Sequence, residues 1–337
     1  MIIRLPFLSF RLTYRSLIVR LSLSVLLASG FVLTLLLGTY PLSLGEVVSL
    51  IFDDGDPIRH MIVMENRMPR ILTAIGSGIA FGIAGALFQT MLRNPLASPD
   101  WIGFTSGASF GALMAIYFFG GYLVFGALVG VVVTSVAVIA LALDNGLNIR
   151  KLIIIGIGAN LTIGAAADLL LSRVDLMTAA DMARWLVGSL NSRDWTDVQL
   201  IWLGILILSP AVFALEFPLK RLMLSDNTAT GLGLNIFNVR ICTSVVAVIL
   251  VALAVSVAGP LPFVAFVSAP IAKRLEGGYA PAFLSAALVG GIIVLFADFI
   301  SRFTPVIQLP TGVFTALIGA PILIWLLVLQ TRNGRFQ

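Results

Sequence analysis

The chain has 337 residues, of which 59% are hydrophobic and 11% are charged, and its mean hydropathy is +1.06. Because about a quarter of the residues in an ordinary globular domain are charged, this composition excludes a soluble globular protein and predicts a polytopic membrane protein. The single cysteine, Cys242, excludes a disulfide framework and a cysteine metal cluster.

Apolar runs recur along the chain at lengths that suit a bilayer core, which takes about 20 residues of helix. They predict ten spanning helices over residues 17–38, 70–92, 101–119, 122–143, 151–171, 198–215, 239–258, 262–272, 280–300 and 312–329. The first run follows several arginines, as in a signal peptide, but it continues through Phe31–Leu37 and therefore favours a retained helix. The eighth run rises only about 16 Å as a helix and could be a half-span. We expect one all-α membrane domain over residues 1–337.

The distribution of charge indicates the orientation of these helices. With both termini in the cytoplasm, 14 of the 21 basic residues but only five of the 16 acidic residues lie on the cytoplasmic side. Cytoplasmic loops of membrane proteins carry an excess of Lys and Arg. Lys273 and Arg274 belong to this set only if the eighth segment crosses the membrane.

A polar segment on the cytoplasmic side, residues 218–235, combines two short helical stretches with a glycine-punctuated end. Its apolar residues Leu222, Met223 and Leu224 could make contacts with a partner. Polar contacts and a helix start could come from Ser225, Asp226, Asn227 and Thr228, followed by Gly231 and Gly233. Composition alone favours an ordinary interhelical loop.

Residues 67–111 contain three ordered motifs. Arg67 and Arg70 flank Met-Pro at the start of the second helix. A polar hinge with Asn94 and Pro95 follows that helix, and proline there opposes helix continuation. Two successive G-x-x-x-G steps, Gly103, Gly107 and Gly111, permit close approach of helix backbones. Packing within one subunit is the favoured use of these glycines, and lining a translocation path is the alternative.

This block, R-M-P-R, L-R-N-P-L-A-S-P and G-F-T-S-G-A, closely resembles the FecCD-type permease subunits of ABC importers for iron–siderophores, haem and vitamin B12. The resemblance covers nearly the whole chain and implies the type II ABC importer fold in a bacterial cytoplasmic (inner) membrane. It also implies separate ABC ATPase subunits, a second permease subunit in a homodimer or heterodimer, and an extracytoplasmic substrate-binding protein. One departure is Ala269-Pro270, where family members commonly carry Pro-His or Pro-Gln.

The resemblance also implies roles for particular residues. Arg67, Arg70 and Arg302 would receive acidic residues of the binding protein, and residues 218–235 would form the coupling helices that dock on the ATPase. Without the resemblance, each arginine could simply anchor a helix end, or Arg302 could pair with Asp298 at i,i+4.

Other functional classes have weaker support. There is no Walker phosphate loop, nucleophile elbow, zinc motif or pair of catalytic carboxylates, so we expect no catalytic residue, no metal or cofactor and no nucleic-acid partner. An ion-coupled secondary transporter would need buried coupling residues, whereas Asp168 and Asp298 are both expected near helix ends where water is close. The resemblance therefore implies a permease for an iron chelate, most simply a ferric siderophore, with haem or cobalamin as alternative cargo.

Overall fold

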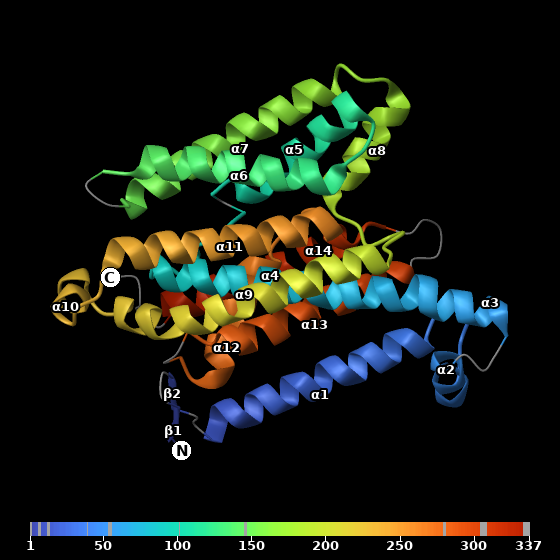
Figure 1. Ribbon diagram of the computed structural model, residues 1–337, viewed down its shortest axis with the longest axis horizontal. Coiled ribbons are helices and arrows are strands. Elements are labelled where there is room, and N and C mark those ends of the chain that lie inside the picture. The colour runs from blue at the N-terminus through green and yellow to red at the C-terminus, as the bar shows by residue number, and fades with distance from the viewer. Residues whose placement is uncertain are drawn as a thin grey trace.

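The computed structural model describes residues 2–5, 8–11, 14–38, 40–52, 56–100, 102–144, 147–278, 281–303 and 309–332 (Figure 1). Among these residues, ten helices have 13 or more residues, and they confirm the ten predicted helices in order. They are α1 (Tyr14–Leu36), α4 (Met68–Met91), α5 (Phe104–Phe119), α6 (Leu123–Ala142), α7 (Ile149–Leu171), α9 (Trp195–Leu222), α11 (Ile236–Ala258), α12 (Val264–Glu276), α13 (Phe283–Arg302) and α14 (Thr311–Arg332). The predicted first residues Trp101 and Ala280 lie outside the described residues.

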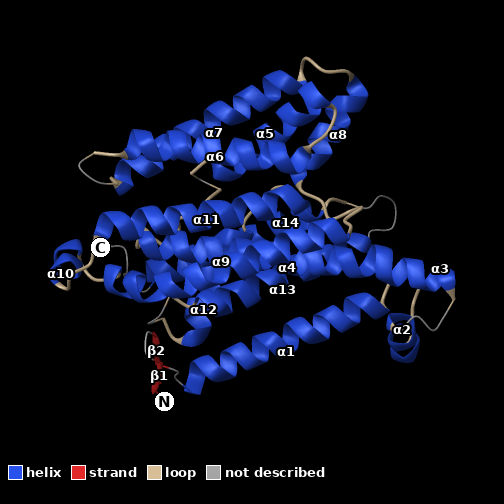
Figure 2. Cartoon of the chain, in the orientation of Figure 1, coloured by secondary structure: helices blue, strands red, loops and turns tan. Residues whose placement is uncertain are grey.

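Shorter elements connect these helices (Figure 2). They are α2 (Leu44–Ile51), α3 (Pro57–His60), the π-helix η1 (Met61–Arg67), α8 (Leu176–Val187) and α10 (Asp226–Gly231). An antiparallel hairpin, β1 (Ile2–Leu5) and β2 (Leu8–Arg11), precedes α1 and was not predicted. The described part of the chain is otherwise helical, as expected for an all-α membrane protein.

The long helices form layers around α4 (Figure 1). Helices α5, α6, α7 and α8 form one layer, α1 lies on the opposite side, and α4 lies between them with α9, α11, α12, α13 and α14. In α4, 20 of the 24 residues are buried. Seven helical segments in the described part are long and apolar enough to cross a membrane, and α5 and the part Thr311–Leu326 of α14 provide shorter apolar helices.

Glycines allow several of these helices to touch backbone to backbone. A Cβ atom added at Gly82 of α4 would lie 2.2 Å from the carbonyl oxygen of Ala286 in α13. A Cβ atom at Gly111 of α5 would likewise lie 2.2 Å from the carbonyl oxygen of Gly126 in α6. Small residues serve this purpose in membranes because packing, rather than water exclusion, drives helix association there.

Helix α9 is longer than the sequence predicts. The predicted helix ends at Leu215 because Glu216 and Pro218 follow, but α9 continues through Pro218 to Leu222. Lys220 Nζ lies 2.6 Å from Glu216 Oε1, and the Arg221 guanidinium lies 4.2 Å from the centre of the Phe217 ring. These i,i+4 contacts span the proline and stabilise the helical turn around it. Residues 218–235 therefore contain one separate short helix, α10, rather than two.

Helix α12 is short, as the sequence suggests. Its 13 residues rise about 20 Å, less than the roughly 30 Å hydrocarbon core, so it crosses only part of a bilayer by itself. Phe263, immediately before it, has a left-handed φ of 66°, and Gly277 ends it with a φ of 98°. At the sequence departure, Pro270 lies inside the helix and Ala269 is fully buried.

Candidate functional sites at the two ends of the bundle

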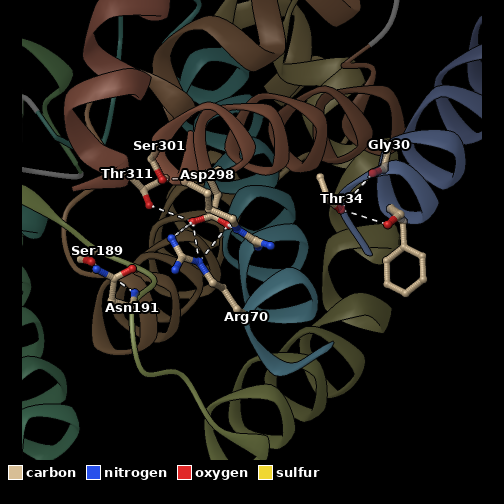
Figure 3. A network of polar contacts seen from close by, with 10 residues as sticks. Gly30, Thr34, Arg70, Ser189, Asn191, Asp298, Ser301 and Thr311 are labelled. Atoms are coloured by element: carbon tan, nitrogen blue, oxygen red, sulfur yellow. Dashed lines mark hydrogen bonds and ion pairs between the residues drawn. The ribbon is translucent and has the colours of Figure 1, made fainter. Parts of the chain in front are cut away.

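A buried ion cluster joins three helices at the end of the bundle where α3 lies. The Asp298 carboxylate of α13 is fully buried and accepts hydrogen bonds from Arg70 of α4, with Arg70 Nη2 at 2.8 Å (Figure 3). Arg302 Nη2 donates to the other carboxylate oxygen at 2.6 Å, and the Thr311 hydroxyl of α14 donates at 3.2 Å. One carboxylate therefore holds two guanidinium groups and fixes the ends of α4, α13 and α14.

Arg67 lies one turn before Arg70 and has different partners. Its Nη1 donates to the Leu35 carbonyl at 2.8 Å, and its Nη2 donates to the Tyr40 carbonyl at 2.5 Å. These bonds satisfy carbonyls at and after the C-terminal end of α1, which have no partner within that helix. Arg67 thus ties the first helix to the segment that leads into α4.

The three arginines predicted to dock a binding protein are therefore largely buried. Arg67 is 7% exposed, Arg70 is 9% exposed and the Arg302 side chain is 12% exposed. With Asp298 as the acidic group, these four side chains carry a surplus of two positive charges. The expectation that Asp298 lies near water is wrong, because Arg70 and Arg302 cover it. Docking itself stays a prediction, and Arg302 is the most exposed of the three side chains.

The opposite end of the bundle carries the segment predicted to couple to an ATPase (Figure 1). Ser225 begins α10 as an N-cap, with its hydroxyl accepting a hydrogen bond from the Thr228 amide at 3.1 Å. Such a cap satisfies one of the free amides at a helix start. After α10, Gly233 turns the chain with a φ of 79°. The segment projects beyond the ends of α9 and α11.

Not all of the predicted contact residues are available there. Leu222 is fully buried and packs in the core, so the structure removes it from the exposed set. Its two neighbours are exposed, Met223 to 41% and Leu224 to 48%, because the chain leaves the helix at this point. The other predicted residues with exposed side chains or backbone are Ser225, Asn227, Thr228, Gly231 and Gly233.

Asp226, also in the predicted set, points back towards the bundle. It pairs with Arg93, in the turn after α4, and with Arg240 of α11, whose Nη2 lies 3.0 Å from Oδ2. Partial burial raises the pKa of Asp226, but the hydrogen bond from Arg93 and the charges of Arg240 and Arg93 outweigh burial and lower it. The carboxylate is therefore held ionised between two cations.

The hinge after α4 is a tight turn fixed by its own polar groups. Arg93 has a left-handed φ of 51°, the Asn94 amide donates to the Gln89 carbonyl at 3.1 Å, and Asn94 Oδ1 accepts from the Leu96 amide at 2.9 Å. This Asx-type turn leads through Pro95 towards Gly103, where a φ of 83° starts α5. Asn94 and Pro95 thus shape the connection between α4 and α5.

Two hollows lie beside α5. Gly107 and Gly111 line an apolar crevice of about 490 Å³ between α5 and α6. A smaller cavity of about 170 Å³ lies between the start of α5 and the start of α12, with Asp100, Thr105 and Phe266 among its lining residues. The sequence analysis did not identify Asp100 as a cavity-lining residue, because nothing in the local pattern indicates that it faces α12.

The fold and these two charged ends define a multi-pass helical membrane protein with a projecting polar segment at one end. The model of the FecCD transport family matches residues 26–329. The chain therefore belongs to the FecCD transport family.

Similar proteins agree with this assignment. The chain is 38% identical over 301 residues to the ferric enterobactin transport system permease protein FepG of Escherichia coli K12, covering 88% of this chain and 91% of that protein. It is 35% identical over 303 residues to the probable siderophore transport system permease protein YfhA of Bacillus subtilis, covering 86% and 88%. A solved structure described as an inward-facing conformation of a metal-chelate type ABC transporter superposes with a TM-score of 0.83 at 27% identity, covering 92% of this chain and 98% of that one.

Proposed function

We propose that this chain is the permease subunit of an ATP-driven importer that carries an iron chelate, most simply a ferric siderophore, into a bacterial cytoplasm. The match to the FecCD transport family over residues 26–329 carries this proposal. The names of the similar permeases support the cargo class, since they include ferric enterobactin and Fe(3+)-citrate systems. The chain itself is not an enzyme in this proposal.

The proposal includes partners and a membrane. The chain forms one transmembrane domain over residues 1–337 in the cytoplasmic (inner) membrane, with both termini in the cytoplasm. Separate ATPase subunits dock on the exposed residues of the segment 218–235, a second permease subunit completes the path, and an extracytoplasmic binding protein delivers the chelate. Asn94, Pro95 and Gly103 then shape the cytoplasmic half of the path, while Gly107 and Gly111 pack α5 beside it. ATP drives transport only through a different affinity for the outward- and inward-facing states.

Uptake into vesicles tests the function and the cargo together. The chain is reconstituted with its ATPase, its second permease subunit and its binding protein, and ferric siderophores, haem and cobalamin are offered in turn. We expect ATP-dependent accumulation of at least one ferric siderophore. Accumulation of only haem or cobalamin would show that the cargo is not a ferric siderophore. Uptake driven by an ion gradient without nucleotide would show that the protein is a secondary transporter rather than an ATP-driven importer.

Replacing Arg302 with glutamine tests the docking role of the outer arginines. Asp298 keeps its bidentate partner Arg70 in this variant, so the fold loses one charge but no buried carboxylate becomes unpaired. We expect the binding protein to dock about two- to fivefold more weakly at low salt, with a shallower salt dependence, because exposed charge pairs contribute up to about 1 kcal/mol and guide encounter. Binding to permease in nanodiscs measures both quantities.

The matched control for this test is Arg150→Gln, which removes an exposed arginine from the opposite end of the bundle. It is expected to leave docking and its salt dependence unchanged. If the folded Arg302→Gln variant docks the binding protein as tightly as Arg150→Gln does, Arg302 serves only the internal ion cluster with Asp298.

Replacing Met223 and Leu224 together with glutamate tests the coupling segment. Both side chains are exposed, so the charges leave the fold intact but oppose burial in an ATPase groove. We expect ATPase recruitment to weaken by about tenfold or more, the effect of losing a hot-spot contact. Co-purification of the ATPase with the permease measures recruitment. Leu309→Glu, an equally exposed leucine at the other end, serves as the control, and equal recruitment by both variants would remove this segment from the interface.

A further inference from the structure

Three segments that are far apart in the sequence meet on one carboxylate at the α10 end of the bundle. Asp226 lies in the first turn of α10 and pairs with Arg93, 133 residues earlier, and with Arg240, 14 residues later. Arg240 contacts both carboxylate oxygens, at 3.3 and 3.0 Å. In Figure 1, α10 lies beyond the ends of α9 and α11. The carboxylate therefore joins a projecting six-residue helix to two deeper parts of the chain.

Both arginines continue the connection beyond the carboxylate. Arg93 Nε donates to the Leu222 carbonyl at 2.6 Å, which fixes the turn after α4 to the last residue of α9. Arg240 Nη1 donates to the Leu147 carbonyl, just before α7, at 3.4 Å. The contacts of Asp226 therefore continue in two directions, to the turn between α4 and α5 and to the start of α7.

The three side chains differ in how far they are buried. The Asp226 side chain is 44% exposed and the Arg93 side chain 33%, and pairs this exposed contribute little to folding. Arg240 is different, since its side chain is 11% exposed and its Nε is buried without a hydrogen-bond partner. The only carboxylate that the described structure places against Arg240 is Asp226, so α10, together with the Leu147 carbonyl, holds the Arg240 guanidinium.

The backbone around this carboxylate is suited to movement as a unit. Arg93 is one of the few non-glycine residues with a left-handed φ, a conformation that persists only while surrounding contacts maintain it. The bonds from its side chain to Leu222 and Asp226 contribute to this, together with the bond from its own backbone amide to the Thr90 carbonyl at 3.3 Å and the bonds of Asn94. On the other side, Ser225 and Gly233 bound α10 and give it defined ends. Loss of the Asp226 contact would remove the bond that connects the turn after α4 to α10.

We propose that Asp226 is a positioning residue that transmits movement of α10 to the turn after α4, through Arg93, and to the start of α7, through Arg240. This proposal rests on the proposed function, in which an ATPase moves residues 218–235. Exposed residues of the segment 218–235, such as Met223 and Leu224, contact the ATPase and move with it. Asp226 then transmits this movement to the helices around the translocation path.

Asp226→Asn tests this role in the complete transporter in vesicles. The amide preserves size but removes the charge that holds both arginines, while the exposed contact residues are unchanged. We expect ATPase recruitment and hydrolysis to remain, and the amount of chelate imported per ATP hydrolysed to fall about fivefold or more, the lower range of measured coupling between sites. Asp226→Glu keeps the charge and is expected to recover part of the coupling. Glu216→Gln removes an ion pair within α9 that joins no two segments, and it is expected to retain wild-type coupling.

Labels on cysteines distinguish this inference from the proposed function itself. With the exposed Cys242 replaced by serine, one label is placed at Thr230→Cys on α10 and another at Leu96→Cys in the turn after α4. In the wild-type background ATP should change the environment of both labels, whereas in Asp226→Asn it should change only the label on α10. If neither label responds in the wild-type background, the ATPase-driven function fails. If both still respond in Asp226→Asn, or import per ATP stays within twofold of wild type, only the role of Asp226 fails.

If the Asp226→Asn variant does not fold, Arg93→Gln tests the same transmission from α10 to the turn after α4. It leaves the Asp226–Arg240 pair in place and removes both bonds of the Arg93 side chain, to Asp226 and to the Leu222 carbonyl. The label at Leu96→Cys should then lose its response to ATP while the label at Thr230→Cys keeps its own. A retained response at Leu96→Cys would overturn the proposed transmission through Arg93.

Discussion

Replacing Asp298 with alanine is expected to lower the free energy of unfolding by about 3–5 kcal/mol, the usual cost of removing one partner from a buried ion pair. The carboxylate is fully buried and compensates two guanidinium groups, Arg70 and Arg302, whose side chains are only 10% and 12% exposed. Without Asp298 these cations face each other in a region with little water. Thermal unfolding of the full chain in nanodiscs measures the loss.

Two further variants show whether charge causes this effect. Asp168→Ala removes an aspartate from another long helix, α7, but that side chain is exposed, so the change should stay within about 0.5 kcal/mol. The triple variant Asp298→Leu, Arg70→Met, Arg302→Met removes all three charges and should recover most of the stability, because apolar replacements of buried pairs are often neutral or better. If the triple variant is as unstable as Asp298→Ala, the loss of stability comes from altered packing rather than from unpaired charge.

The helices could be predicted because each carries its own signal. A continuous apolar run of sufficient length specifies a spanning helix without reference to its neighbours, and all ten were found in order. Errors arose where local rules compete. Glu216 and Pro218 predict a helix end, but contacts of Lys220 and Arg221 with residues four positions earlier carry α9 on to Leu222. The short hairpin before α1 gave no signal strong enough to predict.

The sites were only partly predictable because their partners are distant in the sequence. The spacing of four residues between Asp298 and Arg302 allowed their pairing to be considered. Nothing local indicates that Arg70, 228 positions away, donates to the same carboxylate. The sequence also does not distinguish three consecutive apolar residues, Leu222, Met223 and Leu224. Because α9 ends at Leu222, that side chain is buried and the next two are exposed. The family resemblance located these segments, and the tertiary structure determined which side chains are available.

Replacing Gly85 with alanine is the second change expected to have a large effect. A Cβ atom there would lie 1.8 Å from the carbonyl oxygen of Ala265, a backbone atom at the start of α12 that cannot rotate away. Helix α4 and the short helix α12 would have to separate, and overpacking of this kind costs about 3 kcal/mol at the upper end of measured values. Thermal unfolding of the full chain in nanodiscs again provides the measurement.

The control for Gly85 is Gly158→Ala in α7, where an added Cβ atom meets nothing within 4 Å. That change should leave the free energy of unfolding unaltered or raise it by up to about 1 kcal/mol, because alanine favours the helix over glycine. A leucine at Gly85 should be worse than alanine, since each added atom extends the same overlap with α12. Equal stability of the Gly85→Ala and Gly158→Ala chains would show that α4 and α12 are not in backbone contact, and the placement of the half-span helix would then have to be revised.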